Sequence, residues 1–197
     1  MIAAAGPLCS QPVSFGVKGG IPLLDTTSSH EESRPYIVGP SIEIRLPAGF
    51  AIEADALYRR VGNSSFGSFL SGANLFSAFS SRQRGNSWEF PLLGKYYFRP
   101  RALGWQPFLG SGFALRTTVG FHSDTTRTVV AASGTPTTTS FHHDFRPPLD
   151  VGAVVSAGVR FHAGRLALAP EFRYTRWGGV ENPLNRNEAG ALLGISF

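Results

Sequence analysis

Two short runs contain the residue types that hydrolases and metal sites use. They are FHSD at residues 121–124 and SFHHDF at residues 140–145, and both lie in one Thr-rich segment, 119–147. A hydroxyl, an imidazole and a carboxylate can form the relay of a serine hydrolase. Imidazoles together with a carboxylate can hold a zinc ion, which His142, His143 and Asp144 could do with His122.

Neither run has the spacing that its chemistry needs. Neighbouring side chains of an extended chain point to opposite faces, so His122, Ser123 and Asp124 cannot form a relay among themselves. Adjacent histidines are also common in polar loops. We therefore expect an exposed loop, with no enzymatic activity, no catalytic residue, no bound metal and no cofactor.

The composition favours a β-rich membrane protein. The chain has 197 residues, of which 42% are hydrophobic, 12% are aromatic and only 16% are charged, whereas about 25% is usual for charge in soluble domains. It contains no run of the roughly 18 apolar residues that a membrane helix needs. The net charge of +5 comes from scattered arginines rather than one basic stripe, so we expect no nucleic-acid partner.

Eight segments alternate between apolar and polar residues with a period of two, as strands do. Each is about as long as a tilted membrane strand. They span residues 13–23, 36–46, 50–60, 87–98, 106–118, 149–162, 165–177 and 187–197. The last one keeps apolar residues at every second position as far as Phe197, which indicates a strand that is paired to its end.

Short and long connections alternate between these segments. The short ones are 47–49, 99–105 and 163–164, and the long ones are 24–35, 60–86, 119–147 and 178–186. This alternation is typical of bacterial outer-membrane barrels. We predict an all-β fold: an eight-stranded antiparallel up-and-down transmembrane β-barrel with short periplasmic turns and long extracellular loops.

The barrel domain is expected to cover residues 13–197, after a leader or N-terminal extension at 1–12. This extension holds the one cysteine, Cys9, so no internal disulfide can form. It has small residues but lacks a basic region and a full apolar core. The export signal is therefore not clearly present, and lipidation of Cys9 is a weaker alternative.

Two features favour lipid, rather than a soluble barrel's ligand cavity, as the environment of the apolar face. Aromatic residues collect at both ends of the segments, as they do at the two membrane interfaces; these are Tyr36, Phe50, Tyr58, Trp88, Phe98, Trp105, Phe161, Tyr174, Trp177 and Phe197. Seven bases and seven acids balance on the polar face, which suits a closed interior network; these are Lys18, Glu43, Arg45, Glu53, Asp55, Arg59, Glu89, Lys95, Arg116, Asp150, Arg160, Glu171, Arg173 and Glu188.

Two strand-like runs are the most distinctive, FGVKGGIPL near the start and GALLGISF at the end. In these runs above all, the chain resembles the small eight-stranded proteins of the outer-membrane β-barrel domain family from Gram-negative bacteria. The resemblance implies an integral outer-membrane protein, with lipids as partners. It also implies that Phe197 is part of the signal read by the barrel-assembly machinery, although Ile195 stands where an aromatic is frequent. It implies no activity, since members do many things.

The segment 64–81 is unusually apolar for an exposed loop. It could close the barrel mouth, extend the strands outward or bind a protein partner; the residues concerned are Phe66, Phe69, Leu70, Leu75, Phe76 and Phe79. We expect a structural or interaction role, with loops presented to the exterior, as an independent protein or as a subunit of an envelope assembly. The alternatives are a narrow porin-like channel for small solutes or ions, and a lipid-modifying enzyme.

Overall fold

The computed structural model describes residues 13–25, 36–71, 75–130, 134–145, 148–179 and 186–197. The expected leader at 1–12, with Cys9, lies outside these residues. The described chain forms ten strands: β1 (Val13–Asp25), β2 (Ile37–Arg45), β3 (Phe50–Asp55), β4 (Leu57–Ser71), β5 (Leu75–Tyr97), β6 (Trp105–Val130), β7 (Pro136–Phe145), β8 (Asp150–Ala163), β9 (Leu166–Trp177) and β10 (Asn187–Ser196). No helix in this part of the chain is long and apolar enough to cross a membrane.

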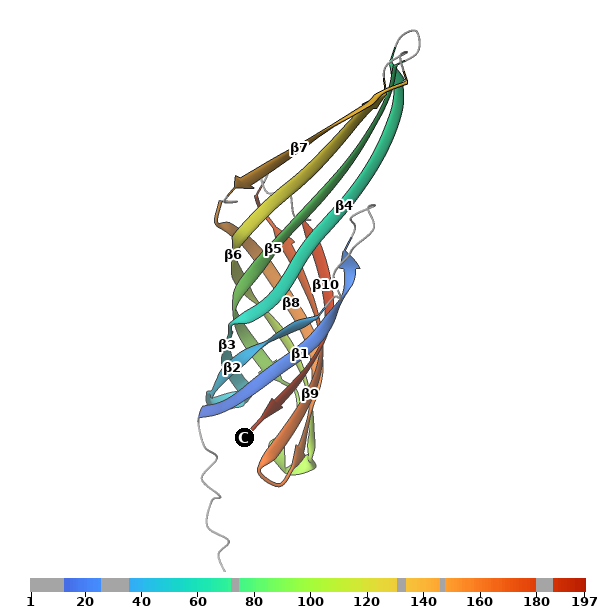
Figure 1. Ribbon diagram of the computed structural model, residues 1–197. Coiled ribbons are helices and arrows are strands. Elements are labelled where there is room, and N and C mark those ends of the chain that lie inside the picture. Colours follow the sequence, from blue (N-terminus) through green and yellow to red (C-terminus); the bar gives the residue numbers. More distant parts are fainter. Residues whose placement is uncertain (1–12, 26–35, 72–74, 131–133, 146–147, 180–185) are drawn as a thin grey trace, which may run out of the picture.

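The strands close into a ring of antiparallel neighbours (Figure 1). Around it the order is β1, β2, β3 with β4, β5, β6, β8, β9 and β10. The first and last strands then pair, from Gly16 opposite Ser196 to Asp25 opposite Glu188. Counting β3 and β4 as one interrupted strand, the ring has eight members, which is the up-and-down barrel that the alternation predicts.

The interruption between β3 and β4 has a local cause. Ala56 separates them, and the register with β2 is the same on both sides, with Ser41 opposite Asp55 and Val38 opposite Tyr58. Pro40 follows from this register as the residue opposite Ala56. The Ala56 N–H donates a hydrogen bond to the Pro40 carbonyl at 3.0 Å. Proline has no N–H with which to donate one in return, so the pairing of the two strands is interrupted at this position.

Tight turns connect the strands at one end of the ring. Two are 3₁₀ turns, Pro47–Gly49 and Arg101–Leu103, and the third joins β8 to β9 at Gly164, whose φ of 65° suits glycine. The C-terminus lies at this end (Figure 1). The predicted short connections are therefore confirmed as turns at a single end.

The opposite end carries a feature that the sequence interpretation placed in loops. Segments 60–86 and 119–147 are largely strand: β4, β5 and β6 continue well past the ring, and β7 is added beside the end of β6 (Figure 1). We call residues 60–71, 75–86, 119–130 and 136–145 the protruding sheet. Two of the four predicted loops are thus extended hairpins, and the segment around 64–81 extends outward rather than closing the barrel mouth.

A bulge separates the barrel part of β6 from its protruding part. The register with β5 shifts between Arg84 and Asn86, opposite Gly120, which has a φ of 61°. Before the bulge the even-numbered Thr118 is buried, and after it the odd-numbered Phe121 is buried. The extra residue exchanges the two faces of the strand, as bulges do.

Candidate functional site

The interior of the ring is filled by charged side chains. Thirteen of the fourteen residues that the sequence assigns there are buried, and the other, Arg45, is 19% exposed at its side chain. They form three layers, which we call central, upper and lower, the lower one being next to the short turns.

The central layer pairs three cations with three carboxylates, all buried: Lys18, Glu53, Asp55, Lys95, Glu171 and Arg173. Glu171 accepts hydrogen bonds from Lys18 at 2.8 Å and from Lys95 at 3.2 Å. Arg173 lies 2.6 Å from the same carboxylate and 2.8 Å from that of Asp55. The layer has no net charge, so each desolvated ion has an opposite charge within reach.

The upper layer joins two arginines to three carboxylates. Arg59 contacts Glu188 at 2.7 Å and Glu89 at 3.1 Å. Arg116 contacts Asp150 at 2.7 Å and stacks over the Trp177 ring, 4.2 Å from its centroid. The indole N–H of this tryptophan donates to Glu188 at 3.1 Å, so the ring belongs to the same network.

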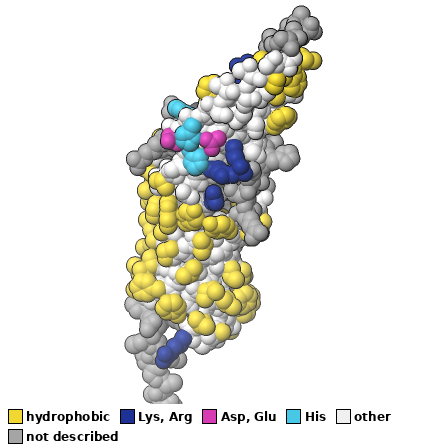
Figure 2. All heavy atoms as spheres, viewed as in Figure 1, with side chains coloured by type: hydrophobic (Ala, Val, Ile, Leu, Met, Phe, Trp, Pro, Cys, Tyr) yellow, Lys and Arg dark blue, Asp and Glu magenta, His cyan; other side chains and the backbone are white. Residues whose placement is uncertain are grey.

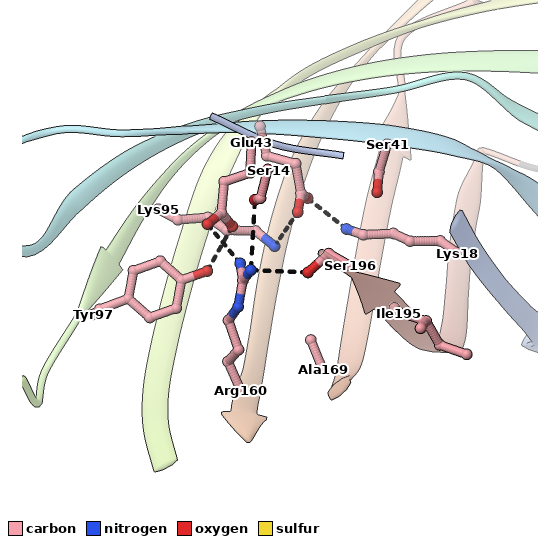
Figure 3. Close-up of a pocket in the computed structure, with 12 residues that line it drawn as sticks. Ser14, Lys18, Ser41, Glu43, Lys95, Tyr97, Arg160, Ala169, Ile195 and Ser196 are labelled. Atoms are coloured by element: carbon pink, nitrogen blue, oxygen red, sulfur yellow. Dashed lines mark hydrogen bonds and ion pairs between the residues drawn. The ribbon is translucent and has the colours of Figure 1, made fainter. Parts of the chain in front are cut away.

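The lower layer is built around Glu43 (Figure 3). Its carboxylate accepts hydrogen bonds from Arg160 at 2.7 Å and from the Tyr97 hydroxyl at 2.6 Å. Arg160 also donates to Ser196 at 2.8 Å, which ties the network to the last strand. A cavity of about 20 Å³ lies among these side chains, which is room for a single water molecule.

Aromatic rings fill the space that inward-facing glycines leave. A Cβ at Gly158 would lie 2.5 Å from the Phe108 ring, and one at Gly152 would lie 2.7 Å from the Trp177 ring. Such distances are far below van der Waals contact, so these glycines accommodate the rings rather than a water path.

The outer face of the ring is apolar over its whole height (Figure 2). Nine of the ten predicted interface aromatics lie there, half-buried or exposed: Tyr36, Phe50, Tyr58, Trp88, Phe98, Trp105, Phe161, Tyr174 and Phe197. Trp177 does not: it is only 2% exposed. Its position at a strand end suggested the interface, but it shares the parity of Glu171 and Arg173, which point inward.

A cluster of charged and imidazole side chains lies on the protruding sheet, above the apolar band (Figure 2). His142 bridges two carboxylates, with Nδ1 2.6 Å from Asp124 and Nε2 3.2 Å from Asp144. The hydrogen bond with Asp124 raises the pKa of His142 above its ordinary 6.5, and the charge of Asp144 adds to this. The same hydrogen bond lowers the pKa of Asp124 below its ordinary 3.8.

This cluster does not assemble a hydrolase relay. Both ring nitrogens of His142 are engaged by carboxylates. His143 lies opposite Ser123. Because side chains alternate along a strand, both point to one face of the sheet, whereas Asp124 and Asp144 point to the other. Among the described residues, no three His, Cys, Asp or Glu side chains are placed to hold a metal ion.

The apolar side chains of the segment 64–81 are spread over both faces of the protruding sheet. Phe66 and Leu70 are 77% and 79% exposed, and Phe69, Phe76 and Phe79 are also exposed. The side chain of Leu75 lies outside the described residues. Leu70 is opposite Phe76 at the tip, while Phe69 and Phe79 have the other parity.

One further network residue was missed in the sequence. Tyr97 is 4% exposed and its hydroxyl donates a hydrogen bond to Glu43, whereas the sequence analysis assigned only its neighbour Phe98 a place, at the membrane interface. The parity of Tyr97 with Lys95 was the available signal.

Comparison with known proteins identifies the kind of molecule that carries this arrangement. A family model described as an outer membrane protein β-barrel domain matches residues 9–178. The N-terminal β-barrel domain of Pseudomonas aeruginosa OprF is 14% identical, over 95% of this chain and 97% of that one, with a TM-score of 0.49. Neisserial surface protein A is 16% identical, over 93% and 94%, also at 0.49. Ail, the attachment invasion locus protein of Yersinia pestis, is 10% identical, over 93% of each chain, at 0.37. No curated protein matches significantly.

Proposed function

The chain belongs to the outer membrane protein β-barrel domain family and is an integral protein of the bacterial outer membrane, and from this premise we propose that it is a structural and interaction protein. In this proposal the barrel is a closed anchor, and the protruding sheet is its interaction surface on the outside of the cell. The observation that carries the proposal is the combination of a filled interior with strands that continue beyond the ring.

The filled interior supports an anchor over a channel. A permeating ion would have to pass three layers of ion pairs, and separating buried charges costs several kcal/mol for each pair broken. The rings of Phe108 and Trp177 occupy the space beside the inward glycines. An eight-stranded barrel is only wide enough for its own side chains.

Planar-bilayer recording tests this role against the narrow porin-like channel. The same preparation should first show a heat-dependent shift on gels, which demonstrates a folded barrel. We expect no discrete conductance steps from the folded protein. Regular steps that scale with the number of inserted molecules would overturn the closed anchor and favour the channel.

Lipids and the assembly machinery are the general partners of this proposal. The exposed aromatics at both ends of the ring fit the two membrane interfaces. Phe197 is 67% exposed, and its backbone pairs with that of Phe15 at 3.0 Å. This leaves its ring accessible as an assembly signal while the strand that carries it is closed.

A protein partner is proposed for the protruding sheet. The exposed Phe66, Leu70 and Phe76 lie beyond the apolar band, near the tip of the sheet. Exposed apolar side chains in such a group indicate an interaction site. We attach no enzymatic activity to the protein, because in the described part of the chain the imidazole of His142 is engaged by Asp124 and Asp144 on the protruding sheet.

A further inference from the structure

The interior charges balance over the whole barrel but not in each layer. The central layer pairs three cations with three carboxylates, whereas the upper layer has two arginines and three carboxylates. The lower layer has the opposite imbalance. Arg45 contacts Glu43 at 2.5 Å, and Arg160 contacts the same carboxylate oxygen at 2.7 Å. In the described part of the chain, the lower layer thus has one more positive charge than negative.

The spare carboxylate of the upper layer lies too far away to compensate this charge. Glu188 contacts Arg59 in the upper layer. Ser196, eight positions further along β10, contacts Arg160 in the lower layer. Eight strand residues span roughly 26 Å, whereas a buried charge needs a partner in direct contact. The Arg45 side chain is 19% exposed, so the layer is open to solution, from which an ion can supply the missing charge.

The cavity of the lower layer has more cations than anions in its lining (Figure 3). The cations are Lys18, Lys95 and Arg160, and the carboxylates are those of Glu43 and Glu53. The volume of about 20 Å³ admits one particle of about the size of a water molecule. A chloride ion is near that size, whereas phosphate, sulfate and carboxylate ions are much larger. The excess positive charge of the lining therefore favours a small anion over a neutral water molecule.

Arg160 and two serines in the lining can donate hydrogen bonds to such an anion. Arg160 is 8% exposed, and its Nε–H has no acceptor among the described residues. Its Nη2 donates to the Ser196 hydroxyl at 2.8 Å and lies 3.5 Å from that of Ser14. A hydroxyl that accepts a hydrogen bond keeps its own hydrogen for another acceptor. All three residues line the cavity, and a donor with a positive charge binds an anion more strongly than a neutral one.

We propose that this cavity binds one chloride ion, held by Arg160 and the hydroxyls of Ser14 and Ser196. The ion neutralises the lower layer. It also joins β8 to β1 and β10, the first and last strands of the ring, at the seam where the barrel closes. The inference goes beyond the anchor role, because it assigns a ligand site to the barrel interior. It agrees with a closed interior, since the ion is bound rather than conducted.

Bromide provides an X-ray test of this site. It scatters anomalously and is close to chloride in size, so crystals of the folded protein grown in sodium bromide show where the anion binds. We expect an anomalous peak in the cavity, in contact with Arg160. Gly194→Ala is the matched variant: Gly194 lines the cavity, and its added Cβ would lie 3.6 Å from Ala169 and from Lys18, which is ordinary contact. The methyl group takes up part of the cavity without straining the barrel, so the peak should disappear.

Urea unfolding in vesicles provides the second arm, in sodium chloride and in sodium gluconate at equal concentration. Gluconate is too large for the cavity. A ligand at about ten times its Kd lowers the unfolding equilibrium constant about eleven-fold, so we expect chloride to stabilise the unmodified protein relative to gluconate. This effect should be lost in Gly194→Ala and kept in Ser156→Ala, which changes a buried serine of β8 outside the cavity lining.

Either of two outcomes overturns the proposal. One is the absence of a bromide peak from the cavity of the unmodified protein. The other is a response to chloride that is the same in Gly194→Ala as in the unmodified protein. Both would leave the conductance test of the closed anchor unaffected, so the two proposals fail separately.

Discussion

Replacing Glu171 by glutamine should strongly destabilise the barrel. Glu171, like Glu53, contacts all three central cations, and neutralising it leaves Lys18, Lys95 and Arg173 facing only two acids. At the 2.8 Å between Lys18 and Glu171, an effective dielectric constant of about 20 gives an attraction of about 6 kcal/mol. The neutral glutamine avoids the cost of burying a charged carboxylate, which offsets part of this attraction. We therefore expect the free energy of unfolding to fall by about 3–5 kcal/mol.

Urea unfolding of the protein in lipid vesicles measures this loss by linear extrapolation. Asp144→Asn, on the exposed part of the protruding sheet, is the control and should unfold like the unmodified protein. The double variant Lys18→Met with Glu171→Gln restores the charge balance and should recover at least half of the stability. If Glu171→Gln unfolds at the same urea concentration as the unmodified protein, the central layer does not hold the barrel together.

Three further variants test other parts of the account. Gly158→Ala should lower the free energy of unfolding by about 1–3 kcal/mol in the same urea assay, because its Cβ would overlap the Phe108 ring. Gly94→Ala, whose Cβ would lie 3.8 Å from its nearest neighbour, should lower it much less. Equal losses in the two variants would contradict the filled interior. NMR titration should place the pKa of His142 above 6.5, and Asp124→Asn should lower it. The ion pair between His142 and Asp124 is therefore complete between the two shifted pKa values; it is lost as pH rises through the pKa of His142 and as pH falls through the pKa of Asp124. An unchanged His142 titration in the Asp124→Asn variant would rule this ion pair out. Phe197→Ala should reduce the amount of folded protein in the outer membrane of cells but leave refolding into vesicles unchanged, and a similar loss in both assays would argue against an assembly signal.

The barrel and its charged interior could be predicted from period-two alternation, because each side chain of a strand in a closed barrel faces either the interior or the outside. The side chain of Glu53 faces the interior and that of Ile52 faces outward with no intermediate choice. Parity alone therefore located the central layer. It could not give the partners, since Lys18 meets Glu171 across 153 positions of sequence, and such contacts depend on the register of the ring.

Outward extension of the strands was one of the alternatives for segment 64–81, but the strands in segment 119–147 were missed, because the side chains on their two faces do not divide into apolar and polar. Segment 136–145 begins PTTTS, and its hydroxyl side chains occupy both faces of β7. The glycine bulge at Gly120 also exchanges the faces of β6, so alternation read through it fails. The available signal was composition: threonine-rich runs favour strands over loops.

Lipid quenching of single tryptophans tests most directly which face of the barrel meets the membrane. The chain has three tryptophans, and phenylalanine at two of them isolates the third. Trp88 and Trp105 are 36% and 39% exposed, whereas Trp177 is 2% exposed. In vesicles containing quencher-labelled lipids, we expect strong quenching of Trp88 and Trp105 and almost none of Trp177. Quenching of Trp177 equal to that of the other two would contradict an interior sealed by its own charge network.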